Sequence, residues 1–337
     1  MNSKSVISLF RHPTMLGNPR VLLLSSLRHG CPPSRSCSGI VSREEESNTE
    51  SSNTSSSRVQ HSPRLSFTSY EAKSRKNLYP LILNHNLMGT RSNLSRVAKE
   101  INRVTRRLVV NVDCRNHGES PKLPEMTYDS MSHDVLSLMS SLEIPKTSFL
   151  GTGMGGRVGM LMALRQPSLL DKLIVINSTP LNHMSIMQRV ERIKMAGQIM
   201  ETCKYDIESA EGIVAKKSVA DKILTPILKD SFDRSLFLTN LVPATAENDN
   251  MWKLNFNAIE ASPLGVFPTF EEGVSFKGPC LFITGDKCDY MKEKDLDEVS
   301  TLFPNAKFIR IPDTGYWLHV ERYRELLEII LPFLTET

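Results

Sequence analysis

The stretch that decides the fold runs Phe149-Leu150-Gly151-Thr152-Gly153-Met154-Gly155-Gly156-Arg157. It begins with a short apolar run, passes through closely spaced glycines and continues into a segment rich in good helix formers. Glycine is the residue that tolerates left-handed or strained backbone at a sharp turn. The pattern therefore predicts a buried strand, a tight turn and the first turn of a helix.

The same alternation of short apolar runs and helical patterns extends outward from this stretch in both directions. Such alternation favours an α/β fold with a mostly parallel central sheet and helices on both faces. Strands are expected at 78–84, 107–113, 147–151, 172–177, 279–285 and 307–311. Helices are expected at 92–104, 127–142, 154–165, 294–302 and 321–334. The alternation breaks between Leu181 and Phe270, where only helical patterns occur, so this segment is predicted to be an inserted helical lid.

The N-terminal region has a different composition from the rest. Residues 1–43 contain six Lys or Arg and no Asp or Glu, which is typical of a mitochondrial transit peptide, so the matrix is the expected location. Residues 44–63 are polar and nearly free of apolar side chains, which predicts a disordered linker. We therefore expect one α/β domain at 64–337, with the lid at about 181–270 inserted in it.

Charge and cysteine content exclude several classes of function. The net charge is +4, but residues 44–337 carry 35 basic and 37 acidic side chains, so the body lacks the charge expected of a nucleic-acid-binding surface. The six cysteines form no C-x-x-C pair, and neither a metal nor a cofactor is expected. No apolar run approaches the roughly 18 residues of a membrane span, so no transmembrane segment is expected.

The central turn lacks the residue that would make it reactive. In serine hydrolases this turn has the sequence G-x-S-x-G, because the sharp bend lifts the Ser hydroxyl clear of the sheet. Here the middle position is Gly153. The same letters match G-x-G-x-x-G through Gly151, Gly153 and Gly156, which leaves nucleotide binding as a third candidate. Nucleotide-binding folds of this kind have an acidic residue at the end of the next strand, which binds the ribose hydroxyls. In this chain that position is the neutral Asn177, which argues against nucleotide binding.

Five further segments carry a resemblance to a known family. They are Leu83-Asn84-His85-Asn86-Leu87-Met88-Gly89, the turn Asp113 to Pro121 (DCRNHGESP), the lid segments 238–242 and 252–255, and Gly315-Tyr316-Trp317-Leu318-His319. From about Tyr79 to Leu334 the chain resembles the mitochondrial abhydrolase domain-containing protein 11 family and its bacterial esterase relatives.

The resemblance implies where a catalytic triad would lie. Its nucleophile, acid and base positions fall at Gly153, Asn177 and Tyr316, and none keeps the required chemistry. A phenol with a pKa of about 10 is protonated at neutral pH and is a poor general base. The family's oxyanion loop and pocket correspond to His85, Asn86, Leu87 and Met154.

Neighbouring groups offer no obvious substitute for the triad. We expect His319 to be a structural, hydrogen-bonding histidine, His117 to fix its turn and Cys288 to be a packed thiol. An acid could also follow the strand ending at Gly285, as Asp286 or Asp289, but it would have no Ser or His to orient.

The sequence thus predicts a mitochondrial pseudoenzyme that binds an acyl ligand or a protein partner. The alternative is a residual or unconventional carboxylic ester or lipid hydrolase that uses another group. The resemblance also implies 2-oxoglutarate dehydrogenase as a partner.

Overall fold

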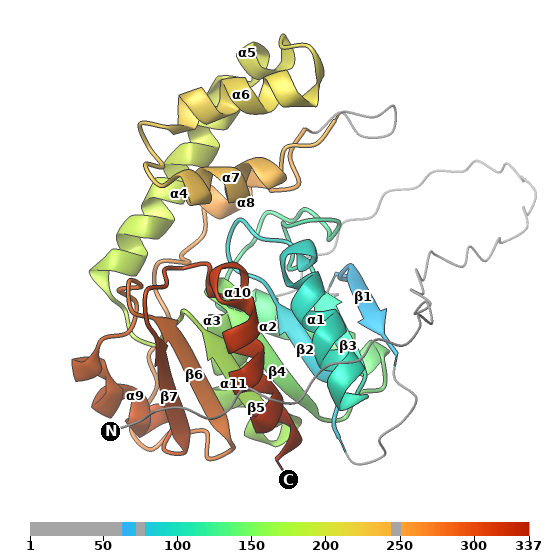
Figure 1. The fold of residues 1–337 in the computed structure, drawn as a ribbon, viewed down its shortest axis with the longest axis vertical. Helices are drawn as coiled ribbons and strands as arrows, with labels where there is room; N and C mark the ends of the chain where they lie inside the picture. The colour runs from blue at the N-terminus through green and yellow to red at the C-terminus, as the bar shows by residue number, and fades with distance from the viewer. Residues whose placement is uncertain (1–62, 72–77, 244–250, 337) are drawn as a thin grey trace, which may run out of the picture.

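The computed structural model describes residues 63–71, 78–243 and 251–336. Within these ranges it contains a seven-stranded sheet in the order β1-β3-β2-β4-β5-β6-β7, parallel throughout except for the β1–β3 pair (Figure 1). The strands are β1 Phe67–Tyr70, β2 Leu81–Asn84, β3 Val109–Val112, β4 Thr147–Thr152, β5 Leu170–Ile176, β6 Cys280–Gly285 and β7 Ala306–Ile311. The predicted α/β architecture is confirmed.

Six of the strands were expected, with ends that differ by at most three residues. Strand β1 was not expected. It is only four residues long, half-buried, and pairs antiparallel with β3 at the sheet edge. A short edge strand carries little apolar periodicity, so nothing in the local sequence distinguishes it from a loop.

Helices cover both faces of the sheet (Figure 1). On β2, Leu81 and Leu83 join the apolar cluster of α1 and α11, whereas Ile82 between them joins the cluster of α2 and α3 on the opposite face. Successive side chains of a strand point to opposite faces, so a strand buried on both sides is apolar throughout. These helices are α1 Arg91–Thr105, α2 Tyr128–Ser141, α3 Met154–Arg165, α9 Leu296–Leu302, α10 Leu318–Glu321 and α11 Tyr323–Thr335.

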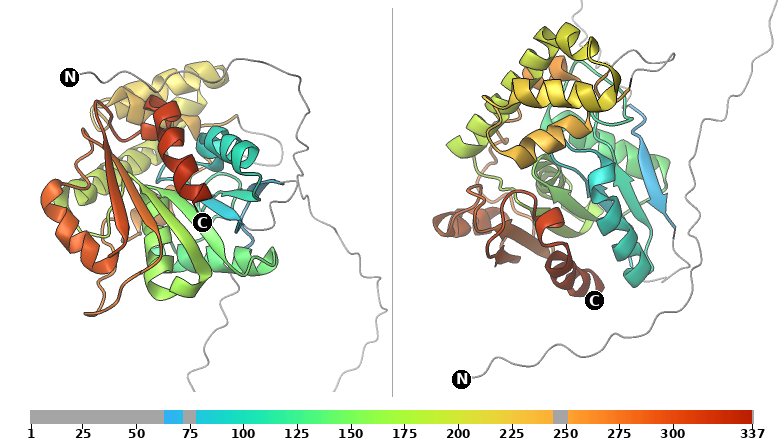
Figure 2. Two further views of the ribbon diagram at one scale, coloured as in Figure 1. Left: turned by 60° about the horizontal axis from the view of Figure 1, so that its bottom comes forward. Right: turned by 45° about the horizontal axis from the view of Figure 1, so that its top comes forward.

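Segment 181–270 contains only helices among its described residues, as expected, and we call it the insert. It lies at one end of the sheet, and the right view of Figure 2 brings it forward. Its helices are α4 Met184–Thr202, α5 Lys204–Glu208, α6 Gly212–Leu224, α7 Ser231–Thr239 and α8 Phe256–Glu260. Rings of Phe237, Trp252 and Phe256 pack against one another at centroid distances of 5.1 to 5.6 Å, which gives the insert its own apolar core.

The predicted transit peptide 1–43 and all but the last residue of the predicted linker 44–63 lie outside the described residues. Among the residues that are described, no helix is long and apolar enough to cross a membrane.

Candidate functional site

The turn between β4 and α3 has the backbone of a nucleophile elbow. Gly153 sits at its apex with φ +51° and ψ −112°, a conformation that favours glycine. Its N–H donates to the Ile176 carbonyl at 3.0 Å, which ties the turn to the end of β5. Position 153 is therefore where the sequence predicted it, and it presents no hydroxyl.

Packing explains the flanking glycines of the elbow. A Cβ on Gly151 would lie 2.2 Å from the Gly155 carbonyl oxygen, and one on Gly155 would lie 2.4 Å from the Asn84 carbonyl oxygen. Real Cβ atoms do not approach backbone so closely. Gly156 is also required by packing, because a Cβ there would lie 2.9 Å from the Ser178 Cβ. The G-x-G-x-x-G letters thus follow from close packing at the elbow, and they need no phosphate to account for them.

Asn86 faces the elbow apex from the loop after β2. A Cβ added at Gly153 would lie 3.0 Å from the Asn86 Cβ, tighter than nine in ten real Cβ contacts. A side chain at 86 and a side chain at 153 therefore compete for the same space. The family resemblance implies an H-G-L-x-G segment with glycine at position 86, so the two departures from that implied pattern are sterically matched.

His85 differs from its expected place in the pocket. It is only 1% exposed, its Nε2 accepts the Cys114 N–H at 3.0 Å, and its Nδ1 lies 2.8 Å from the Asn86 carbonyl oxygen. With Nε2 as acceptor, Nδ1 carries the proton and donates. Burial lowers the pKa of His85, against the attraction of Asp113. The ring is neutral and holds two loops together behind the pocket wall, whereas Asn86, Leu87 and Met154 do line the pocket.

Asn177, at the acid position, fastens three backbone groups. Its Oδ1 accepts the Gly285 N–H at 2.9 Å, and its Nδ2 donates to the carbonyls of Gly315 and Tyr316 at 3.0 Å each. The N–H of Gly285 needs an acceptor, which fixes the amide orientation and turns the donor toward the two carbonyls. Asn177 also has φ +46°, which asparagine tolerates better than most residues. A carboxylate there would face two carbonyl oxygens.

Tyr316, at the base position, is held as a donor. Its hydroxyl donates to Asp289, and the Arg189 guanidinium lies 4.1 Å from its ring centroid. Burial and then the bond to Asp289 raise the pKa of the phenol. Arg189 in turn forms an ion pair with Asp233, which also accepts from Trp317 Nε1 at 3.3 Å. The base position thus belongs to a polar network that joins the insert to the loop before α10.

Beside the elbow lies a small pocket with a cavity volume of about 60 Å³, partly open to solvent. Its lining comes from the carboxyl ends of β2, β4 and β5 together with the insert. The lining residues are Asn86, Leu87, Met88, Tyr128, Gly153, Met154, Arg157, Ser178, Ile186, Arg189, Val190, Ile193, Leu264 and Tyr290. Asn177 and Tyr316 are not among them. Gly153 is therefore the triad position that the pocket reaches.

Three polar lining residues were missed by the sequence analysis. Ser178 donates its hydroxyl to the Gly153 carbonyl at 2.7 Å, next to the empty nucleophile position. Arg157 is 2% exposed and donates to four backbone carbonyls, at both ends of the insert. Arg189 lies on α4 within a stretch that reads as ordinary helix surface. Single polar residues outside any motif give no sequence signal. The one available signal was Arg157, a charged residue in the first turn of the mostly apolar helix α3.

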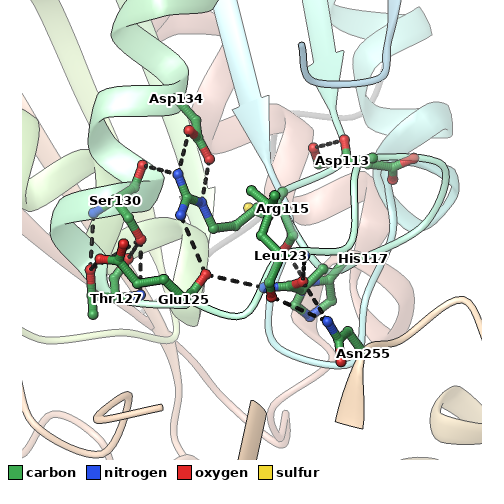
Figure 3. A network of polar contacts seen from close by, with 12 residues as sticks. Asp113, Arg115, His117, Leu123, Glu125, Thr127, Ser130, Asp134 and Asn255 are labelled. Atoms are coloured by element: carbon green, nitrogen blue, oxygen red, sulfur yellow. Dashed lines mark hydrogen bonds and ion pairs between the residues drawn. The ribbon is translucent and has the colours of Figure 1, made fainter. Parts of the chain in front are cut away.

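The turn from Asp113 to Pro121 is structural. Arg115 makes a two-pronged ion pair with Asp134 at 2.6 Å, and Asn116 is joined to Asn255 at the start of α8 by two hydrogen bonds (Figure 3). His117 Nδ1 contacts the Arg115 carbonyl at 3.0 Å, as expected of a residue that fixes the turn. Burial lowers the pKa of His117 well below its usual value. This turn couples the sheet to the insert.

Other candidate groups are far less reactive than their position suggests. His319 is buried with no hydrogen-bond partner for either ring nitrogen among the described residues, so the expected hydrogen bond was wrong; burial lowers its pKa to about 4. Cys288 is the packed thiol that was expected, and burial raises its pKa to about 12. Asp286 accepts the Thr314 N–H at 3.1 Å. No group of three metal-ligating side chains occurs in the described part of the chain.

Comparison with known proteins agrees with this geometry. The family model described as "alpha/beta hydrolase fold" matches residues 79–199. A zebrafish (Danio rerio) relative named sn-1-specific diacylglycerol lipase ABHD11 is 32% identical over 264 residues, covering 76% of this chain and 78% of the relative. The chain belongs to the ABHD11 family of α/β hydrolases.

Bacterial relatives of this ABHD11-family chain are named for ester hydrolysis. Esterase YbfF of Escherichia coli (strain K12) is 25% identical, covering 81% of this chain and all of the relative. A solved structure titled marine microorganism esterase is 26% identical, with a TM-score of 0.68 over 81% of this chain and 100% of that one. The chain thus shares its fold with proteins named as lipases and esterases.

Proposed function

We propose that this ABHD11-family member binds an acyl ligand in the pocket beside the elbow and has lost serine-type covalent catalysis. One observation carries the proposal: a pocket is present beside the elbow, where hydrolases of this fold bind their substrates, and the triad position that lines it is Gly153. Acyl transfer through an enzyme ester needs a hydroxyl or thiol at that point.

The two other triad positions support the same proposal. Asn177 and Tyr316 do not merely lack charge or basicity, because each side chain is committed to other contacts. Asn177 holds the backbone of the loop at 315–316, and Tyr316 donates to Asp289. Neither side chain lines the pocket, so a substrate placed there meets neither of them.

Hydrolysis of a carboxylic ester or lipid by another group is the second candidate, and the names of the relatives favour it. The pocket hydroxyl nearest the elbow belongs to Ser178. It donates to the Gly153 carbonyl at 2.7 Å, and that carbonyl cannot act as a base. A Ser178-dependent reaction would need the side chain to rotate and a water or ligand group to take its proton.

Binding and turnover of one ester separate the two candidates. The full chain is titrated with methyl decanoate by calorimetry, and release of decanoate is followed by mass spectrometry. We expect methyl decanoate to bind saturably, and decanoate to be released no faster by the native chain than by a Ser178→Ala variant. Release of more than about 10⁴-fold over buffer, abolished by Ser178→Ala, would establish hydrolysis instead. Absence of binding by both methyl decanoate and decanoate would remove the acyl-ligand proposal.

The location and partner are further parts of the proposal. The composition of residues 1–43 supports import into the mitochondrial matrix, and the family resemblance supports 2-oxoglutarate dehydrogenase as a partner. Affinity capture of the full chain from mitochondria tests both. Tyr205 and Val214 of the insert are each 81% exposed, so Tyr205→Asp and Val214→Asp should weaken capture if the insert docks. Val320→Asp, on the body and 55% exposed, is the matched control.

A further inference from the structure

All the charged side chains that line the pocket are positive. Arg157 and Arg189 line it, and no Asp or Glu does. We propose that the acyl ligand is a free carboxylic acid, bound as its carboxylate with the head group at the elbow. This inference rests on the proposed function and names the chemical class of its ligand.

Arg157 is a buried cation without a carboxylate partner in the described part of the chain. Its contacts are to the carbonyls of Thr179, Leu181, Leu264 and Gly265 at 2.8 to 3.5 Å. Carbonyl dipoles satisfy its N–H groups but do not cancel its charge. In a pocket of low polarity such a charge attracts an anion over a longer distance than a hydrogen bond does.

Arg189 is paired, but only partly used. Of its five N–H donors the structure commits one, to Asp233. Asp233 itself does not line the pocket and also accepts from Trp317. The other nearby acid, Asp289, is solvent-exposed and bonded to Tyr316. Neither carboxylate lines the pocket, and the donors of Arg189 that are not bonded to Asp233 remain for a ligand.

The lost triad strengthens this polarity. A triad acid would place a negative charge at position 177, whereas Asn177 is neutral. Gly153 presents no side chain at the N-terminus of the twelve-residue helix α3. The Gly155 N–H of its first turn is bonded to the His85 carbonyl at 3.1 Å, but the helix dipole still adds partial positive charge at the same point. A site that lacks a nucleophile and gains positive character suits the carboxylate product of ester hydrolysis better than the neutral ester.

The remaining lining matches the other end of such a molecule. It is formed by aliphatic side chains from the loop after β2, from α4 and from the end of the insert: Leu87, Met88, Ile186, Val190, Ile193 and Leu264. A molecule with a carboxylate at one end and an alkyl chain at the other therefore complements the pocket.

Three ligands of one chain length test the inference on the full chain. Decanoate, decanamide and methyl decanoate are titrated by calorimetry at low salt. Decanamide keeps the shape of the acid without its charge, and replaces one acceptor oxygen by a donor NH₂ group. We expect decanoate to bind at least tenfold more tightly than either neutral ligand, and the advantage should shrink in 0.5 M NaCl.

Matched variants locate the effect. Arg189→Gln should reduce the preference for decanoate to less than threefold, and Arg189→Lys should retain most of it. Arg192→Gln, which alters an exposed arginine on the same helix, should leave it unchanged. The ligand series in the native chain decides the question even if Arg189→Gln does not fold. Equal binding of all three ligands would overturn the carboxylate inference and leave acyl binding intact, whereas no binding of any ligand would overturn both.

Discussion

Restoring a side chain at the elbow apex should destabilise the protein. In Gly153→Ser, the backbone of the new serine must keep φ +51° and ψ −112°. Its Cβ must also lie 3.0 Å from the Asn86 Cβ. Backbone held in such a region costs about 1–3 kcal/mol for a residue other than glycine. A forced contact in a packed site costs about 1–3 kcal/mol more. We expect the free energy of unfolding to fall by about 3 kcal/mol.

The two contributions can be separated in urea denaturation at equilibrium. Gly273→Ser is the control for backbone strain alone, because Gly273 has φ +89° with no atom within 4 Å of an added Cβ. Asn86→Gly removes the steric conflict, so Gly153→Ser should cost about 1 kcal/mol less in that background. If Gly153→Ser costs no more than Gly273→Ser, and Asn86→Gly gives no relief, then the matched exchange at positions 86 and 153 is wrong.

Three other variants give independent checks. Asn177→Asp should destabilise by about 2 kcal/mol, and by more at pH 7 than at pH 4, because a carboxylate would face the two carbonyls that now accept from Nδ2; equal stability would contradict that network. Tyr316→Phe should lose the bond to Asp289 and about 1 kcal/mol of unfolding free energy while methyl decanoate binding stays within twofold, whereas loss of binding would show that the hydroxyl serves the pocket. His319 has a pKa of about 4 in the fold against 6.5 when free, so the unfolded chain binds its proton first and stability should fall as pH drops from 6.5 to 4. His319→Leu should remove about 3 kcal/mol of that loss; an unchanged pH slope in this variant would refute it.

Periodicity and turn chemistry predicted most of the fold. The apolar runs of β4, β5 and β6 are buried on both faces, so their sequence signal is strong. The elbow could be located from its glycines, because both the backbone conformation and the packing require them. The edge strand β1 could not, since its residues are only half-buried.

The sequence indicated the positions of the site but not the contacts of their side chains. The glycine pattern located Gly153, and the family resemblance implied Asn177 and Tyr316 as the acid and base positions, but neither could show what these side chains contact. The contact between Asn86 and the apex joins residues 67 positions apart, and the Tyr316–Asp289 bond joins two separate loops. Such pairs depend on tertiary packing that no local pattern encodes, and the same holds for Arg189 on the insert.

The steric match between Asn86 and Gly153 changes what a restored enzyme requires. Gly153→Ser, Asn177→Asp and Tyr316→His together rebuild the residue types of the triad, but the Ser would still meet the Asn86 Cβ. Adding Asn86→Gly relieves that contact. The quadruple variant should therefore recover more ester hydrolysis than the triple one, and the single Gly153→Ser should recover little because its hydroxyl lacks a base.

Intact-mass spectrometry after treatment with a fluorophosphonate probe tests the loss of serine-type catalysis most directly. The probe forms a covalent adduct with an activated serine, and the quadruple variant serves as the positive control. The native chain, with Gly153 at the apex, is predicted to show no adduct while the quadruple variant is labelled. A stoichiometric adduct on a pocket residue of the native chain, Ser178 above all, would contradict the loss of covalent catalysis.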